Sequence, residues 1–376
     1  MTAAPARRGR RRLVAVAAAG TSLLLLTVGV LSWYFVDRLV QVTPVAESYP
    51  LQVVAVDPTG TVKLSRGPDA DEPGSFRLSW PGGHARAGPV VTSDRTTVTR
   101  SLTEISGRLT SGQRVGIQAN PFTGDPRSGL GLAFTDVAVA GATGALPAWY
   151  IAGPRQTWVL LIHGLDGSRA DTLPAMPTLS ALGFPMLAIT YRNDTGAASS
   201  ADHRSHLGDT EWQDIEAAID YARGNGAQGV VLYGWSLGAG MAVVTSEQAP
   251  RRDAIRALVL DSPLLDWRAT LSFHASRHGL PAPFTWASET MLDVGLGVHL
   301  DRYSAHRLAA ALTVPVLVVQ GTADAVVPLA TADAFARARP DLVSYLRVVG
   351  ADHVSGTDSD PDRYATALER LLGPLP

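Results

Sequence analysis

The chain has 376 residues and is 46% hydrophobic, which is enough to form a large buried core and argues against disorder. Its formal net charge of −2 gives no general attraction to nucleic acid, so we expect no nucleic-acid partner. The chain contains no cysteine, which excludes disulfides, thiolate catalysis and cysteine-ligated metal sites.

The N-terminus combines a basic cluster with a long uncharged segment. Residues 1–12 contain five arginines, and residues 13–36 carry no charge. As a helix rising about 1.5 Å per residue, this segment would be about 36 Å long and could cross a hydrocarbon core about 30 Å thick. Because clustered arginines favour the cytoplasmic side, we predict a basic cytoplasmic tail over 1–12, a transmembrane helix over 13–36 and an extracytoplasmic remainder. A cleaved signal peptide is the alternative, but small residues usually follow its apolar region, whereas this one ends in Trp33, Tyr34 and Phe35.

Residues 41–132 are rich in glycine, proline, threonine and serine. Short segments of strand-forming residues recur there, separated by turn sequences such as Pro81-Gly82-Gly83. The pattern predicts a small β-rich accessory region, with a loosely ordered stalk as the alternative. The predicted strands cover residues 51–56, 61–64, 76–80, 96–100 and 115–118.

Over residues 133–376, apolar segments of strand length alternate with helical segments. The apolar segments are hydrophobic on both faces, as the strands of a central parallel sheet are. A helix is predicted over residues 210–223, with capping-box spacing between Thr210 and Gln213. The alternation predicts an α/β fold with a doubly wound, mostly parallel sheet, interrupted by a lid region at about 262–313. The predicted strands cover residues 158–162, 185–190, 229–233, 257–260, 316–320 and 345–349.

One of these strands runs into Gly234-Trp235-Ser236-Leu237-Gly238, and a helical pattern follows. A G-x-S-x-G sequence between a strand and a helix forms a sharp turn that exposes its serine at the helix N-terminus. The helix dipole there favours developing negative charge. We predict that Ser236 is a catalytic nucleophile; a purely structural turn is the alternative.

A serine nucleophile needs a histidine base that is oriented by an acid. Asp324 and His353 each follow a predicted strand, and the chain order serine, acid, histidine is the one expected when the serine lies on such a turn. Because the carboxyl ends of parallel strands meet at one edge of a sheet, we predict a catalytic triad of Ser236, Asp324 and His353. Asp261 and Asp352 are the alternatives for the acid.

An oxyanion hole needs two backbone N–H donors close to the serine. We expect one from Leu237, directly after the nucleophile, and the other from the loop His163-Gly164-Leu165. Leu165 is the first candidate in that loop and Gly164 the second. His163 precedes the serine in the chain, and we interpret it as a residue that positions its loop.

No cofactor and no metal site are expected. His203 and His206 lie near Asp202 and Asp209 in the sequence, but the segment is interpreted as a polar loop before a helix. The histidines of the lid region fit no ligand spacing.

Together these motifs resemble the α/β-hydrolase superfamily: the turn at Ser236, His163-Gly164, the Gly-x-x-Asp-x-x-Val-Pro sequence at Asp324, and His353. Tyr191-Arg192-Asn193-Asp194 is similar to its bacterial prolyl-oligopeptidase-like branch. The resemblance covers about residues 133–376 and implies a serine hydrolase with the triad Ser236, Asp324 and His353 and two backbone donors. Together with the predicted anchor over 13–36, we expect a membrane-anchored hydrolase that acts on a small-molecule or lipid ester. A serine peptidase and a catalytically silent fold used for binding are the alternatives.

Overall fold

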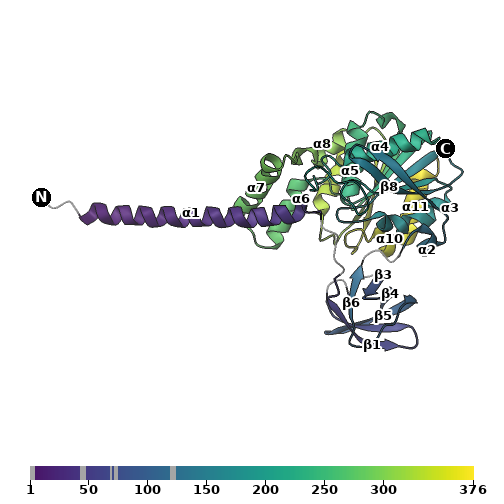
Figure 1. Cartoon of the computed structure of the whole chain (residues 1–376), viewed down its shortest axis with the longest axis horizontal. Helices are drawn as coiled ribbons and strands as arrows, with labels where there is room; N and C mark the ends of the chain where they lie inside the picture. The colour runs from purple at the N-terminus through teal and green to yellow at the C-terminus, as the bar shows by residue number, and fades with distance from the viewer. Residues whose placement is uncertain (1–4, 43–47, 68–69, 72–74, 119–123) are drawn as a thin grey trace.

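The structure is a computed structural model that describes residues 5–42, 48–67, 70–71, 75–118 and 124–376. The first four residues of the predicted basic tail lie outside this described part. A long N-terminal helix, a small β-barrel and a larger α/β part follow one another along the chain (Figure 1).

Helix α1, Pro5–Val40, extends away from the rest of the molecule (Figure 1). Its segment Ala18–Val40 is long and apolar enough to cross a membrane, as a signal sequence near an N-terminus also is. The C-terminal end of the helix is different, because Val36 and Val40 are buried in the core of the α/β part. The N–H of Ser205 donates to the Val40 carbonyl at 2.9 Å, so the last turn of α1 is fixed to the α/β part.

The β-rich region forms a closed antiparallel barrel of six strands in the order β1-β2-β5-β4-β3-β6. Pairing of β1 with β6, which places Leu51 opposite Val115, closes it. Apolar side chains such as Leu64 and Leu78 alternate along the strands and fill the interior. The strands are β1 Leu51–Asp57, β2 Thr61–Ser65, β3 Phe76–Trp80, β4 Gly83–Ser93, β5 Thr97–Ser106 and β6 Arg114–Gln118.

The α/β part is built on an eight-stranded sheet in the order β14-β13-β12-β11-β9-β10-β8-β7. The strands from β9 to β14 are parallel, whereas the β7–β8 hairpin is added antiparallel beside β10. The fold is therefore the predicted doubly wound, mostly parallel sheet. The strands are β7 Thr135–Gly141, β8 Gly144–Ile151, β9 Thr157–Ile162, β10 Met186–Ile189, β11 Gly229–Trp235, β12 Ile255–Asp261, β13 Val316–Gly321 and β14 Val343–Val348.

Helices cover both faces of this sheet, and successive strand residues enter opposite cores. From β9, Leu160 and Ile162 join the core under α4 and α5, and Val159 joins the core under α3 and α11. Burying each such side chain stabilises the fold by roughly 1.5–3 kcal/mol. The covering helices are η1 Arg169–Ala175, α3 Met176–Ala181, α4 Trp212–Gly224, α5 Leu237–Gln248, α9 Leu329–Ala338 and α11 Pro361–Leu372, with short helices α2 Pro126–Leu130, η2 Arg252–Ala254 and α10 Gly356–Ser359.

A helical insertion separates β12 from β13, where the sequence predicts a lid. Asp266 precedes its first helix as the N-cap, and the Asp266 carboxylate accepts the N–H of Ala269 at 2.9 Å. The insertion comprises α6 Trp267–Arg277, α7 Ala282–Thr290, the π-helical turn η3 Met291–Gly295, the 3₁₀ turn η4 Leu300–Arg302 and α8 Ala305–Ala310.

The predicted capping box at Thr210 is wrong. Helix α4 begins at Trp212, and Glu211 occupies the N-cap position without a side-chain capping bond. The buried Glu211 carboxylate instead accepts the N–H groups of His206 and Gly208, at 2.7 and 3.0 Å. The preceding loop turns inside the protein, where its N–H groups need acceptors that water cannot supply.

Candidate active site

Ser236 lies in a strained turn between β11 and α5. Its φ of 52° and ψ of −117° are values that residues with a side chain rarely adopt. Its N–H donates to the Asp261 carbonyl at 2.9 Å, which holds the turn against β12. A Cβ on Gly234 would lie 2.4 Å from the backbone of Gly238, and a Cβ on Gly238 would lie 2.3 Å from two carbonyl oxygens at the end of β9. Both positions therefore require glycine.

Three predicted residues meet beside this turn: Ser236, Asp324 after β13, and His353 after β14. Nε2 of His353 lies 2.9 Å from the Ser236 hydroxyl oxygen, and Nδ1 lies 2.9 Å from Oδ2 of Asp324. A neutral imidazole in this position donates from Nδ1 to the carboxylate and can accept a proton at Nε2. The geometry suits removal of the hydroxyl proton.

The carboxylate of Asp324 is bound by donors on both oxygens. Oδ1 accepts the N–H groups of Val326 and Val327 at 2.8 and 2.9 Å, and Oδ2 accepts the Gln320 amide at 2.7 Å in addition to His353. The side chain is fully buried, so these bonds replace its lost hydration. Gln320 is missing from the sequence-based candidates, although a polar residue ending an apolar strand is a usable signal.

Asp352, an alternative for the acid, binds backbone groups. Its Oδ1 accepts the N–H of Ala325 and the N–H of His353, each at 2.8 Å. These bonds connect the loop after β14 to the loop after β13. Asp352 therefore holds together the two segments that carry Asp324 and His353.

Asp261, the other alternative, is fully buried beneath the site at the end of β12. Its Oδ2 accepts the Tyr364 hydroxyl at 2.7 Å, and its Oδ1 accepts the Ser262 hydroxyl at 3.1 Å. The Ser262 oxygen in turn accepts the N–H of Val354, next to His353, at 2.9 Å. Burial raises the pKa of Asp261 to about 6, although the bonds from Tyr364 and Ser262 oppose this effect. Asp261 thus supports the histidine loop through Ser262.

His163 is buried and is bound within its own loop region, in agreement with its interpretation as a positioning residue. Nε2 lies 2.8 Å from a carboxylate oxygen of Asp194, and Nδ1 lies 2.9 Å from the Gly164 carbonyl oxygen. The ring stacks on Tyr191, whose hydroxyl donates to the same carbonyl at 2.7 Å. Burial lowers the pKa of His163, but the Asp194 carboxylate outweighs it, so the pKa is raised. The ring favours the protonated form, with a donor toward each acceptor.

Two backbone segments border the Ser236 hydroxyl. Leu237 is the first residue of α5, so its N–H has no partner within the helix. On the other side, a Cβ on Gly164 would lie 3.1 Å from the Ser236 Cβ and 3.8 Å from its Oγ, so this backbone passes directly beside the serine. The predicted donors Leu237 and Leu165 belong to these two segments.

Within the part of the chain that the structure describes, no three histidine, aspartate or glutamate side chains are grouped so that they could hold a metal ion. Among the histidines of the predicted polar loop, His206 pairs with Asp202, with Nε2 and Oδ2 3.3 Å apart. Both side chains of this pair are partly exposed to solvent.

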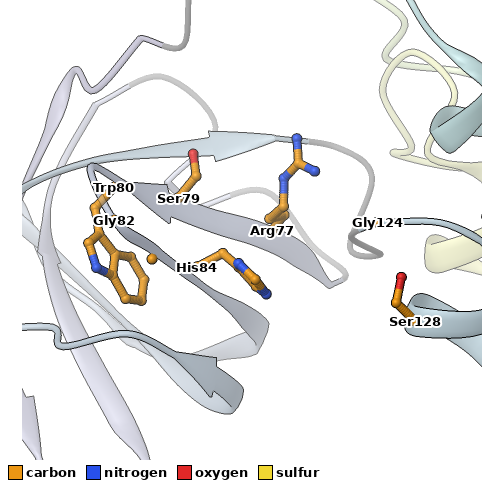
Figure 2. Close-up of a pocket in the computed structure, with 8 residues that line it drawn as sticks. Arg77, Ser79, Trp80, Gly82, His84, Gly124 and Ser128 are labelled. Atoms are coloured by element: carbon orange, nitrogen blue, oxygen red, sulfur yellow. The ribbon is translucent and has the colours of Figure 1, made fainter.

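A separate cavity lies between the barrel and the α/β part. Its barrel side includes Arg77, Ser79, Trp80 and His84 from β3 and β4, and Ser128 of α2 lies on the other side (Figure 2). None of Ser236, Asp324 and His353 lines this cavity. The cavity and the Ser236 site are therefore distinct features.

The comparisons with known proteins identify the α/β part. The family model for the prolyl oligopeptidase family matches residues 173–370, which is more than half of the chain and includes Ser236, Asp324 and His353. The chain belongs to the prolyl oligopeptidase family. It is a serine hydrolase with an α/β-hydrolase fold. A second model, for a domain of unknown function (DUF8805), matches residues 52–118, which hold all of the barrel except its first residue, Leu51.

Similar proteins and solved structures each match more than half of the chain. An uncharacterized protein of Mycobacterium tuberculosis is 27% identical over 234 residues, which are 60% of this chain and 74% of that protein. The uncharacterized protein YfhR of Salmonella typhi is 26% identical over 219 residues, 55% of this chain and 66% of YfhR. Among solved structures, an esterase of Pyrococcus furiosus superposes with a TM-score of 0.54 at 19% identity, covering 67% of this chain and 95% of the esterase. That similarity establishes the shared fold.

Proposed function

We propose that this protein hydrolyses carboxylic esters through an acyl-enzyme on Ser236, with His353 as the base and Asp324 as the acid that orients it. The observation that carries the proposal is a continuous chain of hydrogen bonds from the Ser236 hydroxyl through both nitrogens of His353 to Asp324, 2.9 Å at each step. A silent fold used only for binding has no need of this chain of contacts.

In the proposed reaction, the Ser236 oxygen attacks the substrate carbonyl carbon while Nε2 of His353 takes the hydroxyl proton. Asp324 keeps the second proton of the ring on Nδ1 and stabilises the imidazolium. The tetrahedral intermediate expels the alcohol, which receives its proton from His353, and the acyl group remains on Ser236. A water molecule, deprotonated by the same imidazole, then attacks the acyl carbon, and the acid leaves as the imidazolium returns this proton to the Ser236 oxygen.

We assign stabilisation of the intermediate to the backbone N–H groups of Leu237 and Leu165, with Gly164 as the second choice for the latter. Leu237 begins α5, and the dipole of that helix also favours negative charge at this point. Losing one donor of this kind lowers the rate by roughly 10²–10³.

We propose further that residues 13–36 hold the protein in the cell membrane as a single-pass helix, with the hydrolase part on the extracytoplasmic side. The five arginines before the segment support this orientation. The competing hypothesis of a cleaved signal peptide predicts a shorter mature chain. The N-terminal peptide of protein extracted from membranes, identified by mass spectrometry, distinguishes them: retention of residues 13–36 is expected, and a chain starting after them would overturn the anchor.

Peptide cleavage is the second candidate function, because the matching family is named for an oligopeptidase. Nitrophenyl esters of increasing chain length, assayed beside aminoacyl amides, separate the two. We expect efficient turnover of esters and little of amides. Faster turnover of amides than of esters would mean that the protein cleaves peptide bonds rather than carboxylic esters.

Labelling with a fluorophosphonate probe tests the nucleophile, because this reagent reacts with activated serines. We expect the full-length protein to be labelled and Ser236→Ala to be unlabelled. The matched control is Ser344→Ala, which changes an exposed serine on the edge strand β14 and should label normally. A label that persists in Ser236→Ala would disprove the assignment.

A further inference from the structure

The helical insertion between β12 and β13 contacts both the apolar helix α1 and the Ser236 site. Helix α7 runs beside the C-terminal half of α1 (Figure 1). The Ser32 hydroxyl donates to the Phe284 carbonyl at 3.2 Å, and the rings of Phe35 and Phe284 pack edge to face with centroids 5.3 Å apart. Ser32 and Phe35 belong to the uncharged run 13–36, and Ser32 lies about 6 Å from its end by helical rise. Helix α7 is thus level with the end of the apolar segment.

The surface of the insertion next to α1 is apolar and exposed. Trp286 on α7 is 69% exposed, and Val294 on η3 is 82% exposed. Between residues 279 and 298 the chain has only two charged residues, Glu289 and Asp293. Both form ion pairs with Arg268 of α6, at 2.7 and 2.5 Å.

The same insertion borders the Ser236 site. The N–H of Leu264, just before the insertion's first helix, donates to the Ser236 carbonyl at 3.0 Å. On α6, Nε2 of His274 donates to the Val326 carbonyl at 2.9 Å, and the N–H of Val326 donates to Asp324. The insertion therefore reaches from α7 and η3, through α6, to the rim of the site.

We propose that the exposed face of α7 and η3, carrying Trp286 and Val294, rests on the lipid bilayer around α1, so that the site receives amphipathic lipid esters from the membrane. The occupant is a bilayer because α7 and η3 pack against α1, on which Leu23, Leu25 and Leu26 are 64–66% exposed. Tryptophan prefers the boundary between hydrocarbon and water, the level at which Trp286 lies. The proposal rests on the proposed ester hydrolysis for its substrate.

The first test measures where the face lies. Because the chain has no cysteine, Val294→Cys introduces a single thiol that can carry an environment-sensitive fluorophore in full-length protein reconstituted into phosphatidylcholine vesicles. Val91→Cys, on the barrel strand β4 and 58% exposed, is the matched control. We expect spin-labelled lipid to quench the fluorophore at 294 but not at 91, and aqueous iodide to do the reverse. Equal quenching by iodide at both positions overturns the docking surface.

The second test measures substrate delivery with Trp286→Asp, because an exposed charge weakens contact with lipid. We expect wild-type turnover of a water-soluble acetate ester and a roughly tenfold loss on an oleoyl ester presented in the vesicles. Val91→Asp should leave both activities unchanged. An unchanged ratio in Trp286→Asp overturns delivery from the membrane, whereas failure of the wild type to hydrolyse either ester counts against the proposed function itself.

Discussion

Replacing Asp261 with asparagine should change how the stability of the protein depends on pH. Burial raises the pKa of Asp261 from its ordinary value of 3.8 to about 6 in the folded protein. Between these two pH values the folded state keeps a proton that the unfolded chain has lost, so stability decreases as the pH rises through this interval. A shift of about two pKa units corresponds to a cost of about 3 kcal/mol, which is present in full above pH 7 and absent well below pH 4.

Urea unfolding from pH 4 to pH 8, followed by tryptophan fluorescence on detergent-solubilised full-length protein, measures this effect. Asparagine cannot ionise and can still accept the Tyr364 hydroxyl bond. The free energy of unfolding of Asp261→Asn minus that of the wild type should therefore be roughly 2–3 kcal/mol larger at pH 8 than at pH 4. Burial also raises the pKa of Asp358 to about 6; the burial effect is present in both proteins and cancels from the difference, and only the smaller repulsion between Asp358 and Asp261 is lost in the variant. A difference that stays constant with pH would refute the reasoning.

Three further substitutions test the supports of the site. Gly238→Ala places a Cβ 2.3 Å from two backbone carbonyl oxygens, so we expect loss of ester hydrolysis and a lower Tm; wild-type values for both would contradict the steric argument. Gln320→Leu removes the 2.7 Å bond to Asp324 and should lower kcat roughly tenfold with little change in KM, whereas unchanged steady-state kinetics would show that the backbone donors suffice. Asp194→Asn removes the carboxylate that raises the pKa of His163. That substitution should cost about 1–3 kcal/mol of unfolding free energy at pH 6, and the cost should decrease as the pH rises through the raised pKa of His163; a cost independent of pH would rule out a charged pair.

The parts of the fold that the sequence predicts well are those encoded locally. Every residue of β9 and β11 is buried, and a strand buried on both faces has an unbroken apolar sequence. Strands β7 and β8 lack that signal, because their sequences mix exposed and buried positions. Their place in the sheet depends on pairing across the fold, such as Ala188 of β10 opposite Trp149 of β8. No local pattern contains that information.

The residues of the site also fall into two groups, those that are encoded locally and those that depend on distant contacts. The turn at Ser236 is contained in five consecutive residues, and the positions of Asp324 and His353 follow from strand ends and chain order. The groups that support them are defined by distant contacts: Tyr364 reaches Asp261 across 103 residues of sequence. A tyrosine on the apolar face of a C-terminal helix is indistinguishable from an ordinary core residue until the helix is docked.

Because Val36 and Val40 are buried in the core of the α/β part, α1 is not a flexible tether. A helix that continues without interruption from Pro5 into that core fixes the height and tilt of the enzyme above any bilayer that the helix crosses. An enzyme held in this way would meet a membrane-bound substrate by lateral diffusion in the bilayer, and the same rim of the enzyme would always face the membrane.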